Sequence, residues 1–319
     1  MRSLLGLDPD GYAVAALHGV DRTFPETNCY ADVWIELLHA RGHVVEAAMA
    51  FTLAIDFEGD QWTFFKPPPD DLELLFGIDV HEMQLYRPMV DHLLEQLARG
   101  RTMIIEVDSH YLPDTAGTSY RATHVKSSIA IEAIDPLAER LVYFHGRGLH
   151  ELTGDDYRGV FRLGRPFSSD VLPPYAEVVR FDAGPVLEGA ALRAAARGLL
   201  ARHLARRPLR NPWLTFGERL ARDLPALLAD DEEAYHAFAF ATVRQSGAAF
   251  DTARSFVDWL LPEGPDGRAA SEALGRQVAG SKSLLFKLAR RRQFDPEPAI
   301  ADLAGAWEAT AVALARAAG

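Results

Sequence analysis

Residues 102–145 read TMIIEVDSHYLPDTAGTSYRATHVKSSIAIEAIDPLAERLVYFH, and this stretch decides the fold of the first half of the chain. Residues 102–107 are rich in β-branched side chains, residues 124–134 alternate polar and apolar, and residues 140–144 are again apolar. Such runs are typical of strands, and the Asp-Pro pair between the last two predicts a turn that pairs them antiparallel. The loop over residues 109–123 is long, and loops of this length in compact domains are often functional.

A helix is predicted upstream of these strands, over residues 30–40, because apolar side chains recur there at helical spacing. Thr27 or Asn28 can cap its start, and Gly42 follows its end. Further predictions are two helices over 72–76 and 80–99, a short strand over 61–65, and a segment over 47–55 that fits either a helix or a strand. The first half is therefore expected to mix helices and strands.

The second half has a different composition. Beyond about residue 185, Ala, Leu and Arg dominate with helical periodicity, and we expect four to six helices and no strand. Residues 1–184 carry 29 acidic and 15 basic side chains, whereas residues 185–319 carry 16 and 18. With a linker near residues 173–184, these shifts predict an α/β domain over 1–180 and an all-α domain over 185–319.

Composition excludes several classes of protein. Of 319 residues, 48% are hydrophobic and 24% charged, which is ordinary for a globular protein and unlike a disordered chain. The net charge of −12 disfavours a general nucleic-acid binder. A single cysteine excludes internal disulfides and multi-cysteine metal sites, and neither a histidine metal motif nor a phosphate-binding glycine loop is found. No apolar run is long enough for a membrane span or a secretory signal, so we expect a cytoplasmic protein without metal or membrane association.

Cys29 is the candidate nucleophile. It directly follows the predicted capping loop, and the free N–H groups at a helix N-terminus stabilise both a thiolate and a developing oxyanion. Its base is expected to be a histidine, and His124 fits best because it opens a strand after a long loop. Asp108, which follows the strand 102–107, is the first candidate for the orienting carboxylate, and His145 is the second. The alternative is that Cys29 is buried and inert.

A family resemblance supports this assignment. The segments that carry it are ETNCYADVWIELLHARG, FEGDQWTFFK, EVDSHYLPDT, YRATHVKSSIAIEAID and LVYFHGRGLHEL. They resemble the bacterial family known as domain of unknown function 1839 (DUF1839) over nearly the whole chain. More distantly, their order is similar to the N-terminal domain of the butirosin biosynthesis acyltransferase and to papain-like, C39-type cysteine peptidases. The resemblance implies an α+β fold, with a papain-like cysteine-nucleophile domain followed by a helical domain.

The resemblance also implies roles for individual residues. Cys29 matches the nucleophile and His124 the base of a group whose butirosin-type members move an acyl group from a carrier-protein thioester to an amine. The acidic member of C39-type folds falls near His145, where this sequence has no carboxylate, and the oxyanion glutamine upstream of the cysteine is missing. Asn28 or Gln61 are candidates to replace that glutamine. These departures favour a transferase over a classical peptidase.

Other residues are expected to contact the substrate or a partner. The carboxylates of Glu58 and Asp60 either hold a substrate ammonium group or belong to a simple turn before a strand. The expected substrate-binding residues are Asn28, Tyr30, Glu58, Asp60, Gln61, Tyr120 and Lys126. Arginines of the helical half, represented by Arg206, Arg207, Arg290 and Arg291, form either a solvated surface or a docking face for an acidic carrier protein.

The sequence thus predicts a cysteine-dependent acyl or aminoacyl transferase. Its donor is expected on a phosphopantetheinyl carrier protein, its acceptor is a small-molecule or peptide amine, and it needs no cofactor of its own. Two alternatives remain open at this stage. One is a hydrolase of the peptidase, amidase or thioesterase type, and the other is a non-catalytic module that binds a carrier protein.

Overall fold

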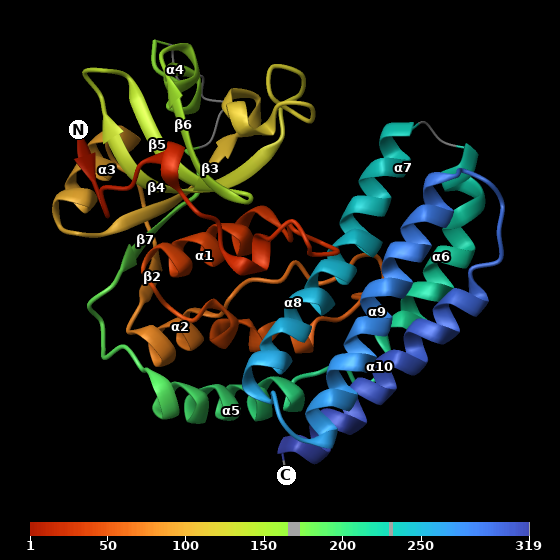
Figure 1. Cartoon of the computed structure of the whole chain (residues 1–319). Coiled ribbons are helices and arrows are strands. Elements are labelled where there is room, and N and C mark those ends of the chain that lie inside the picture. The colour runs from red at the N-terminus through yellow and green to blue at the C-terminus, as the bar shows by residue number, and fades with distance from the viewer. Residues whose placement is uncertain (165–172, 230–231, 319) are drawn as a thin grey trace. The chain divides into compact units, whose positions relative to one another are not determined.

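The computed structural model of the chain describes residues 1–164, 173–229 and 232–318 (Figure 1). It divides into two compact units. The first comprises residues 1–18, 29–43 and 69–186, and the second comprises residues 19–28, 44–68 and 187–319. Both units are therefore assembled from segments that are far apart in the sequence, and the second unit takes two segments from the first half of the chain.

The first unit is built on an antiparallel sheet with the strand order β2-β7-β3-β4-β5-β6, and the short β1 pairs with β4. Its strands are β1 (Arg2–Ser3), β2 (Asp79–Glu82), β3 (Thr102–Asp108), β4 (Lys126–Asp135), β5 (Arg140–His145), β6 (Gly148–Thr153) and β7 (Ala176–Arg180). Its helices are α1 (Cys29–Ala40), α2 (Pro69–Phe76), α3 (Met89–Ala98) and α4 (Asp155–Val160). The predicted antiparallel pairing of the two strands around the Asp-Pro turn is confirmed.

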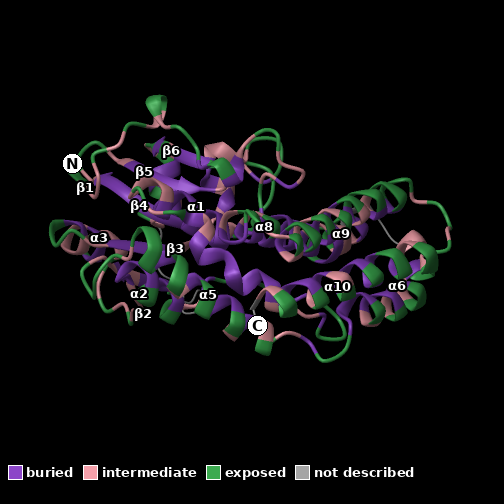
Figure 2. Cartoon of the chain, turned by 60° about the horizontal axis from the view of Figure 1, so that its bottom comes forward, coloured by how far each residue is buried: buried purple, intermediate pink, exposed green. Residues whose placement is uncertain are grey.

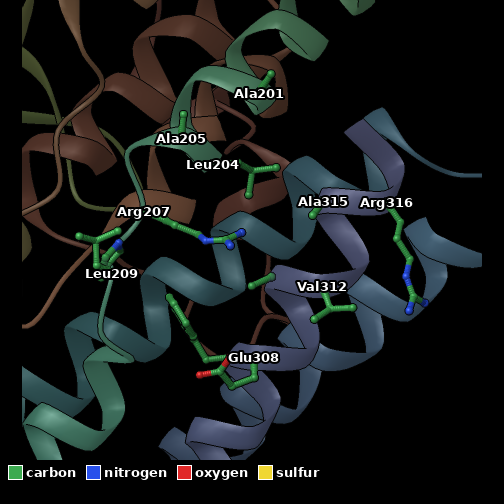
Figure 3. Close-up of a pocket in the computed structure, with 12 residues that line it drawn as sticks. Ala201, Leu204, Ala205, Arg207, Leu209, Glu308, Val312, Ala315 and Arg316 are labelled. Carbon is green, nitrogen blue, oxygen red and sulfur yellow. The ribbon is translucent and has the colours of Figure 1, made fainter. Parts of the chain in front are cut away.

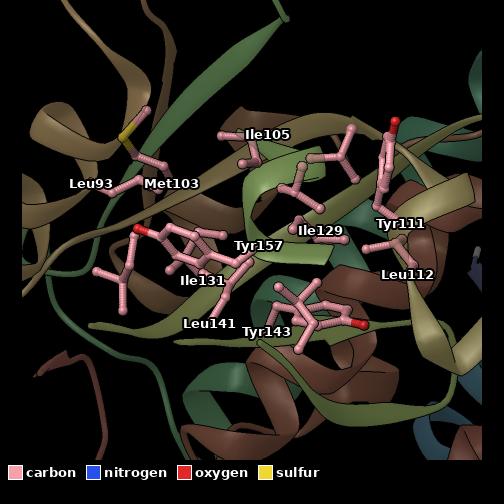
Figure 4. Close-up of a cluster of buried hydrophobic side chains, with 14 of the residues drawn as sticks. Leu93, Met103, Ile105, Tyr111, Leu112, Ile129, Ile131, Leu141, Tyr143 and Tyr157 are labelled. Carbon is pink, nitrogen blue, oxygen red and sulfur yellow. The ribbon is translucent and has the colours of Figure 1, made fainter. Parts of the chain in front are cut away.

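The two faces of strand β4 point into different surroundings. One face bears Ile129 and Ile131, which pack with side chains of β3, β5, α3 and α4 in a buried apolar cluster (Figure 4). The other face bears Ser128 and Ala130 and lies against α1, whose residues from Tyr30 to Leu38 are all buried (Figure 2). Because successive strand residues point to opposite faces, the neighbours Ser127 and Ser128 belong to different environments.

The alternation along β4 slips once. The pairing register with β5 shifts between Ile131 and Ala133, which marks a β-bulge. The bulge returns Ile134 to the same apolar cluster as Ile129 and Ile131, although it lies an odd number of residues further on. The buried Glu132 at the bulge accepts hydrogen bonds from backbone N–H groups near the N-terminus, which ties β1 to the sheet.

Three sequence predictions about secondary structure are wrong. Residues 80–99 are not one helix, since β2 occupies 79–82 and α3 begins only after Pro88, whose ring cannot enter a helix interior. The predicted linker over 173–184 contains strand β7, which pairs with β2 and β3. Residues 61–65 form no strand, because Trp62 makes only an isolated β-bridge with Phe57.

The C-terminal region within the second unit is helical, as predicted. Within its described residues the helices are α5 (Gly189–Ala205), α6 (Pro212–Ala229), α7 (Glu232–Ala239), α8 (Gln245–Leu260), α9 (Pro265–Ala289) and α10 (Glu297–Ala318). The ambiguous segment over 47–55 is a 3-10 helix, Val45–Ala54, which packs on α5 and α8. Trp62, Trp213, Phe216 and Phe250 form a buried aromatic cluster in this unit. None of the helices that the structure describes is both long and apolar enough to cross a membrane.

Candidate functional site

Cys29 is the first residue of α1, and its side chain is half-buried. Its thiol donates a hydrogen bond to the Ser128 hydroxyl, with 3.8 Å between Sγ and Oγ. N–H groups in the first turn of a helix lack intrahelical acceptors, and the helix dipole adds partial positive charge at this end. Both effects stabilise an anion, so the position of Cys29 suits a thiolate and the oxyanion that its attack would create.

His124 and Asp108 form a hydrogen-bonded pair at the start of β4. Nδ1 of His124 lies 2.6 Å from Oδ2 of Asp108, and the other carboxylate oxygen accepts from the backbone N–H of His110. The ring of His110 stacks on His124 at 4.4 Å between centroids. The structure thus brings two predicted site residues together, because β3 ends at Asp108 beside the beginning of β4. Their catalytic roles stay a prediction.

Cys29 and His124 are not hydrogen-bonded to each other. In the part of the chain that the structure describes, the thiol bonds to Ser128 of β4, which follows His124 by four residues in the sequence. The His124 side chain is 69% exposed and precedes the first residue of β4. Direct proton transfer between the two groups therefore requires the exposed segment before β4 to carry the imidazole toward the thiol.

Charged groups lie beside Ser128 on the same face of the sheet. Glu106 of β3 pairs in register with Ser128, and its carboxylate lies 3.0 Å from Nζ of Lys126. Lys126 was predicted as a substrate-binding residue, and the structure gives it this cross-strand ion pair. A carboxylate and an ammonium group are thus held next to the residue that the thiol contacts.

Tyr30, another predicted substrate-binding residue, is buried beneath the same face. Its hydroxyl donates to Glu177 of β7 at 2.6 Å, and Tyr175 donates to the second oxygen of that carboxylate at 2.7 Å. Burial, followed by the negative charge of Glu177, raises the pKa of the Tyr30 hydroxyl far above its ordinary value. Tyr30 therefore remains a neutral donor that anchors α1 to the sheet.

Tyr120 lies with a different set of residues. Its hydroxyl donates to Asp156 of α4 at 3.0 Å, and Arg121 forms an ion pair with the same carboxylate. This places Tyr120 beside α4 rather than beside the thiol of Cys29.

His145 is also held by a carboxylate, but on the opposite face of β4. Its Nδ1 lies 2.5 Å from Oδ2 of Asp114, and its Nε2 lies 2.6 Å from the hydroxyl of Ser127. The sequence has no carboxylate next to His145, but the long loop folds back and brings Asp114 to its ring. His145 is consequently not a partner for His124.

The remaining predicted substrate residues belong to the second unit. The amide nitrogen of Asn28 donates to the backbone oxygen of Phe65 at 3.0 Å. Glu58, Asp60 and Gln61 are exposed around a tight turn, in which the Glu58 N–H donates to the Gln61 carbonyl at 2.8 Å. This geometry agrees with the alternative interpretation of the acidic segment as a turn.

The predicted docking arginines lie at the ends of helices. Arg206 and Arg290 are exposed at the C-termini of α5 and α9, and Arg291 lies over the ring of Tyr235. Arg207 lines an open cavity of about 930 Å³ between α5 and α10 (Figure 3). Arg316 and Glu308 lie on the α10 side of this cavity, so its charged rim is mixed rather than uniformly basic.

Sequence reasoning missed several residues of these clusters, namely Glu106, Asp114, Ser127, Ser128 and Glu177. For Ser128 a signal was present, because the period-two alternation of β4 assigns it to the face opposite Ile129 and Ile131. For Asp114 and Glu177 no local signal exists, since a loop and a distant strand bring them into place.

Two family models match the chain. The DUF1839 N-terminal domain matches residues 13–181, and the DUF1839 C-terminal domain matches residues 189–316. The chain belongs to the DUF1839 family. The boundary between the two matches falls between β7 and α5. No curated protein matches the sequence of this DUF1839 member.

Proposed function

We propose that this DUF1839 protein is a cysteine-dependent acyl or aminoacyl transferase whose first unit has a papain-like, C39-type arrangement. The observation that carries the proposal is the placement of Cys29 at the N-terminus of α1, facing strand β4, at whose start Asp108 and His124 are already paired. Cysteine-dependent acyl transfer needs a nucleophilic thiol and a histidine base on neighbouring elements. Here the thiol lies at a helix N-terminus, and the histidine precedes the strand that this thiol faces.

The proposed reaction begins with attack of the Cys29 thiolate on a thioester carbonyl. Asp108 accepts from Nδ1–H of His124, which leaves Nε2 with the lone pair of a general base. His124 takes the thiol proton and returns it to the departing thiol of the donor. An amine then attacks the acyl carbon, the bond to Sγ of Cys29 breaks, and His124 moves the amine proton to the departing sulfur as the amide is released. The positive end of the α1 dipole stabilises the oxyanion in both steps.

This mechanism demands that His124 approach the thiol. The exposed imidazole and the exposed residues around it allow that movement at little cost in packing, and catalytic hydrogen bonds are often long before substrate binds. Ser128, the present partner of the thiol, holds Cys29 against β4 until then.

The proposed acyl donor is a thioester on an acidic carrier protein, and the proposed acceptor is an amine. Arg206, Arg207, Arg290 and Arg291 of the second unit supply the complementary charge for carrier docking. Lys126 and Glu106, adjacent to Ser128, are proposed to contact the substrate. We place the reaction in the cytoplasm, where a single thiol stays reduced.

The test uses a radiolabelled aminoacyl thioester of N-acetylcysteamine, a small mimic of a carrier-bound donor. We expect one equivalent of label on the wild-type protein, released by neutral hydroxylamine as a thioester would be. Because the chain has one cysteine, Cys29→Ala should carry no label, whereas the matched control Ser128→Ala should still be labelled. No label on the wild type, or equal label on Cys29→Ala, overturns the covalent mechanism.

The alternatives give different outcomes in the same experiment. A hydrolase releases free acid at the same rate with and without an added amine. A carrier-binding module leaves Cys29 unlabelled, and its thiol reacts with a disulfide reagent no faster than that of a denatured control.

A further inference from the structure

Ser127, His145 and Asp114 form a second cluster of reactive side chains in the first unit. The Ser127 hydroxyl lies 2.6 Å from Nε2 of His145, and Nδ1 of the same ring lies 2.5 Å from Oδ2 of Asp114. This cluster lies on the face of β4 opposite the one that Cys29 contacts, because Ser127 and Ser128 point in opposite directions.

The protonation states in this cluster follow from its partners. Burial alone would raise the pKa of Asp114, but the hydrogen bonds from His145 and Tyr143 and the attraction to the neighbouring histidines hold it below its usual range. Asp114 is therefore an ionised acceptor, and Nδ1 of His145 must donate to it. In the neutral ring, which the role of a base requires, Nε2 then accepts from the Ser127 hydroxyl.

The carboxylate is fixed from a second direction. Tyr143 donates its hydroxyl to the other oxygen of Asp114 at 2.5 Å, and burial together with the Asp114 charge keeps the pKa of this phenol far above its ordinary value. Nε2 of His150 donates to the backbone oxygen of His145 at 3.0 Å. The imidazole thus has one orientation, which points its basic nitrogen at Ser127.

The Ser127 hydroxyl lies just below the surface. Ser127 is 7% exposed and His145 is 8% exposed, but Val125, on the same side of the chain, is 52% exposed. The residues from 121 to 126 that lead into β4 are all exposed. Access to the hydroxyl by a small molecule therefore requires displacement of this exposed segment, because Ile129 and Ile131 on the other side belong to the buried apolar cluster.

We propose that Ser127, His145 and Asp114 form a second, serine-based acyl-handling site, which accepts small uncharged carboxylic esters. Ser127 is placed as the nucleophile, His145 as its base and Asp114 as the carboxylate that orients the base. Such a triad is recognised by its geometry and not by the sequence positions of its members. This site does not depend on Cys29 and extends the chemistry beyond the proposed transferase.

Nε2 of His145 takes the proton of Ser127, the Oγ–C bond forms, and the bond from the acyl carbon to the alcohol oxygen breaks. The alcohol leaves with the proton from Nε2. Water then attacks the acyl-serine, gives its proton to Nε2, and releases the acid as the proton returns to Oγ.

Diisopropyl fluorophosphate, a small uncharged reagent for activated serines, tests this proposal on the full-length chain. We expect one adduct per chain, located on Ser127 by peptide mass mapping. The labelling rate should fall at least about 100-fold in His145→Gln, in line with loss of a general base. Ser127→Ala should carry no adduct, and the matched control Ser128→Ala should be labelled like the wild type.

Two further results keep the site separate from Cys29 and from misfolding. Cys29→Ala should be labelled at the wild-type rate, so failure of the thiol mechanism and failure of the serine site are distinguishable. Asp114→Asn should slow the labelling and also change the pH dependence of the labelling rate, while circular dichroism shows an unchanged fold. No adduct on the folded wild type, an adduct on another residue, or equal labelling of His145→Gln overturns the proposal.

Discussion

The first unit holds two His–Asp pairs that share one chemistry and differ in their surroundings. The side chains of His124 and Asp108 are 69% and 30% exposed, and the paired N and O atoms lie 2.6 Å apart. The side chains of His145 and Asp114 are each 10% exposed, and their paired atoms lie 2.5 Å apart. Water can replace either partner of the exposed pair, but nothing replaces a partner of the buried one. The exposed pair can therefore move and react with little loss of folding stability, whereas the buried pair also stabilises the fold.

The largest effect that separates the pairs is expected in catalysis. His124→Gln should lower the rate of acyl transfer by about 10²–10⁴-fold, because the base for Cys29 is lost. The free energy of unfolding should change by less than about 0.5 kcal/mol, since the side chain is largely solvated. Transfer kinetics and guanidinium unfolding measure the two quantities. A stability loss as large as that of a buried-site variant would contradict the assignment of His124 to an exposed reactive pair.

The next effect is expected in folding stability, and here the buried pair should be affected more than the exposed pair. Asp114→Asn should lower the free energy of unfolding by about 2–4 kcal/mol, because His145 and Tyr143 both lose a charged acceptor in a buried site. The matched variant Asp108→Asn should cost about 0–1 kcal/mol. Urea unfolding of both variants measures this difference. Equal losses of unfolding free energy in the two variants would contradict the distinction between a buried and an exposed pair.

A second buried histidine, His18, extends the comparison to pH. Burial lowers the pKa of His18, but hydrogen bonds and attraction from Asp32 and Glu36 outweigh it and raise this pKa to about 9. Because the folded pKa exceeds the unfolded value of about 6.5, the protonated ring stabilises the fold fully below that pH, and this stabilisation is lost as pH rises through 9. The contribution is roughly 2–4 kcal/mol.

The control for this pH effect is His18→Gln, which removes the titrating group. The free energy of unfolding of the wild type should fall between pH 6.5 and 9, and that of the variant should be flatter over the same range. Parallel curves for the two proteins would show that His18 is not protonated in the folded state.

The exposed pair could be predicted from the sequence, and the buried one could not. Asp108 ends strand β3, and His124 precedes strand β4, which is the next strand along the chain. The antiparallel pairing of β3 with β4 therefore already brings the two side chains together. Asp114 reaches His145 only because of the path that the loop takes between those strands, and no periodicity encodes that path. Local patterning thus specifies neighbours along a hairpin better than contacts made by a loop.

The same distinction explains the errors in the fold. The helix start at Cys29 and the three central strands were predicted because capping and alternation are local signals. Strands β2 and β7 were missed because each finds its partner far away in the sequence. Residues 61–65 look like a strand because they are aromatic, yet Trp62 is buried against aromatic side chains of helices rather than in a ladder.

The smallest effect is expected at the exposed ion pair between Lys126 and Glu106, which are 54% and 31% exposed. Lys126→Gln should cost about 0–1 kcal/mol at low salt. Raising the ionic strength to about 1 M shortens the screening length to about 3 Å, so the difference from wild type should then vanish. The loss in Asp114→Asn should persist at that salt concentration, because buried groups are screened much less. Unfolding at two salt concentrations therefore classifies each pair by its surroundings, and a salt-independent cost at Lys126 would move it into the buried class.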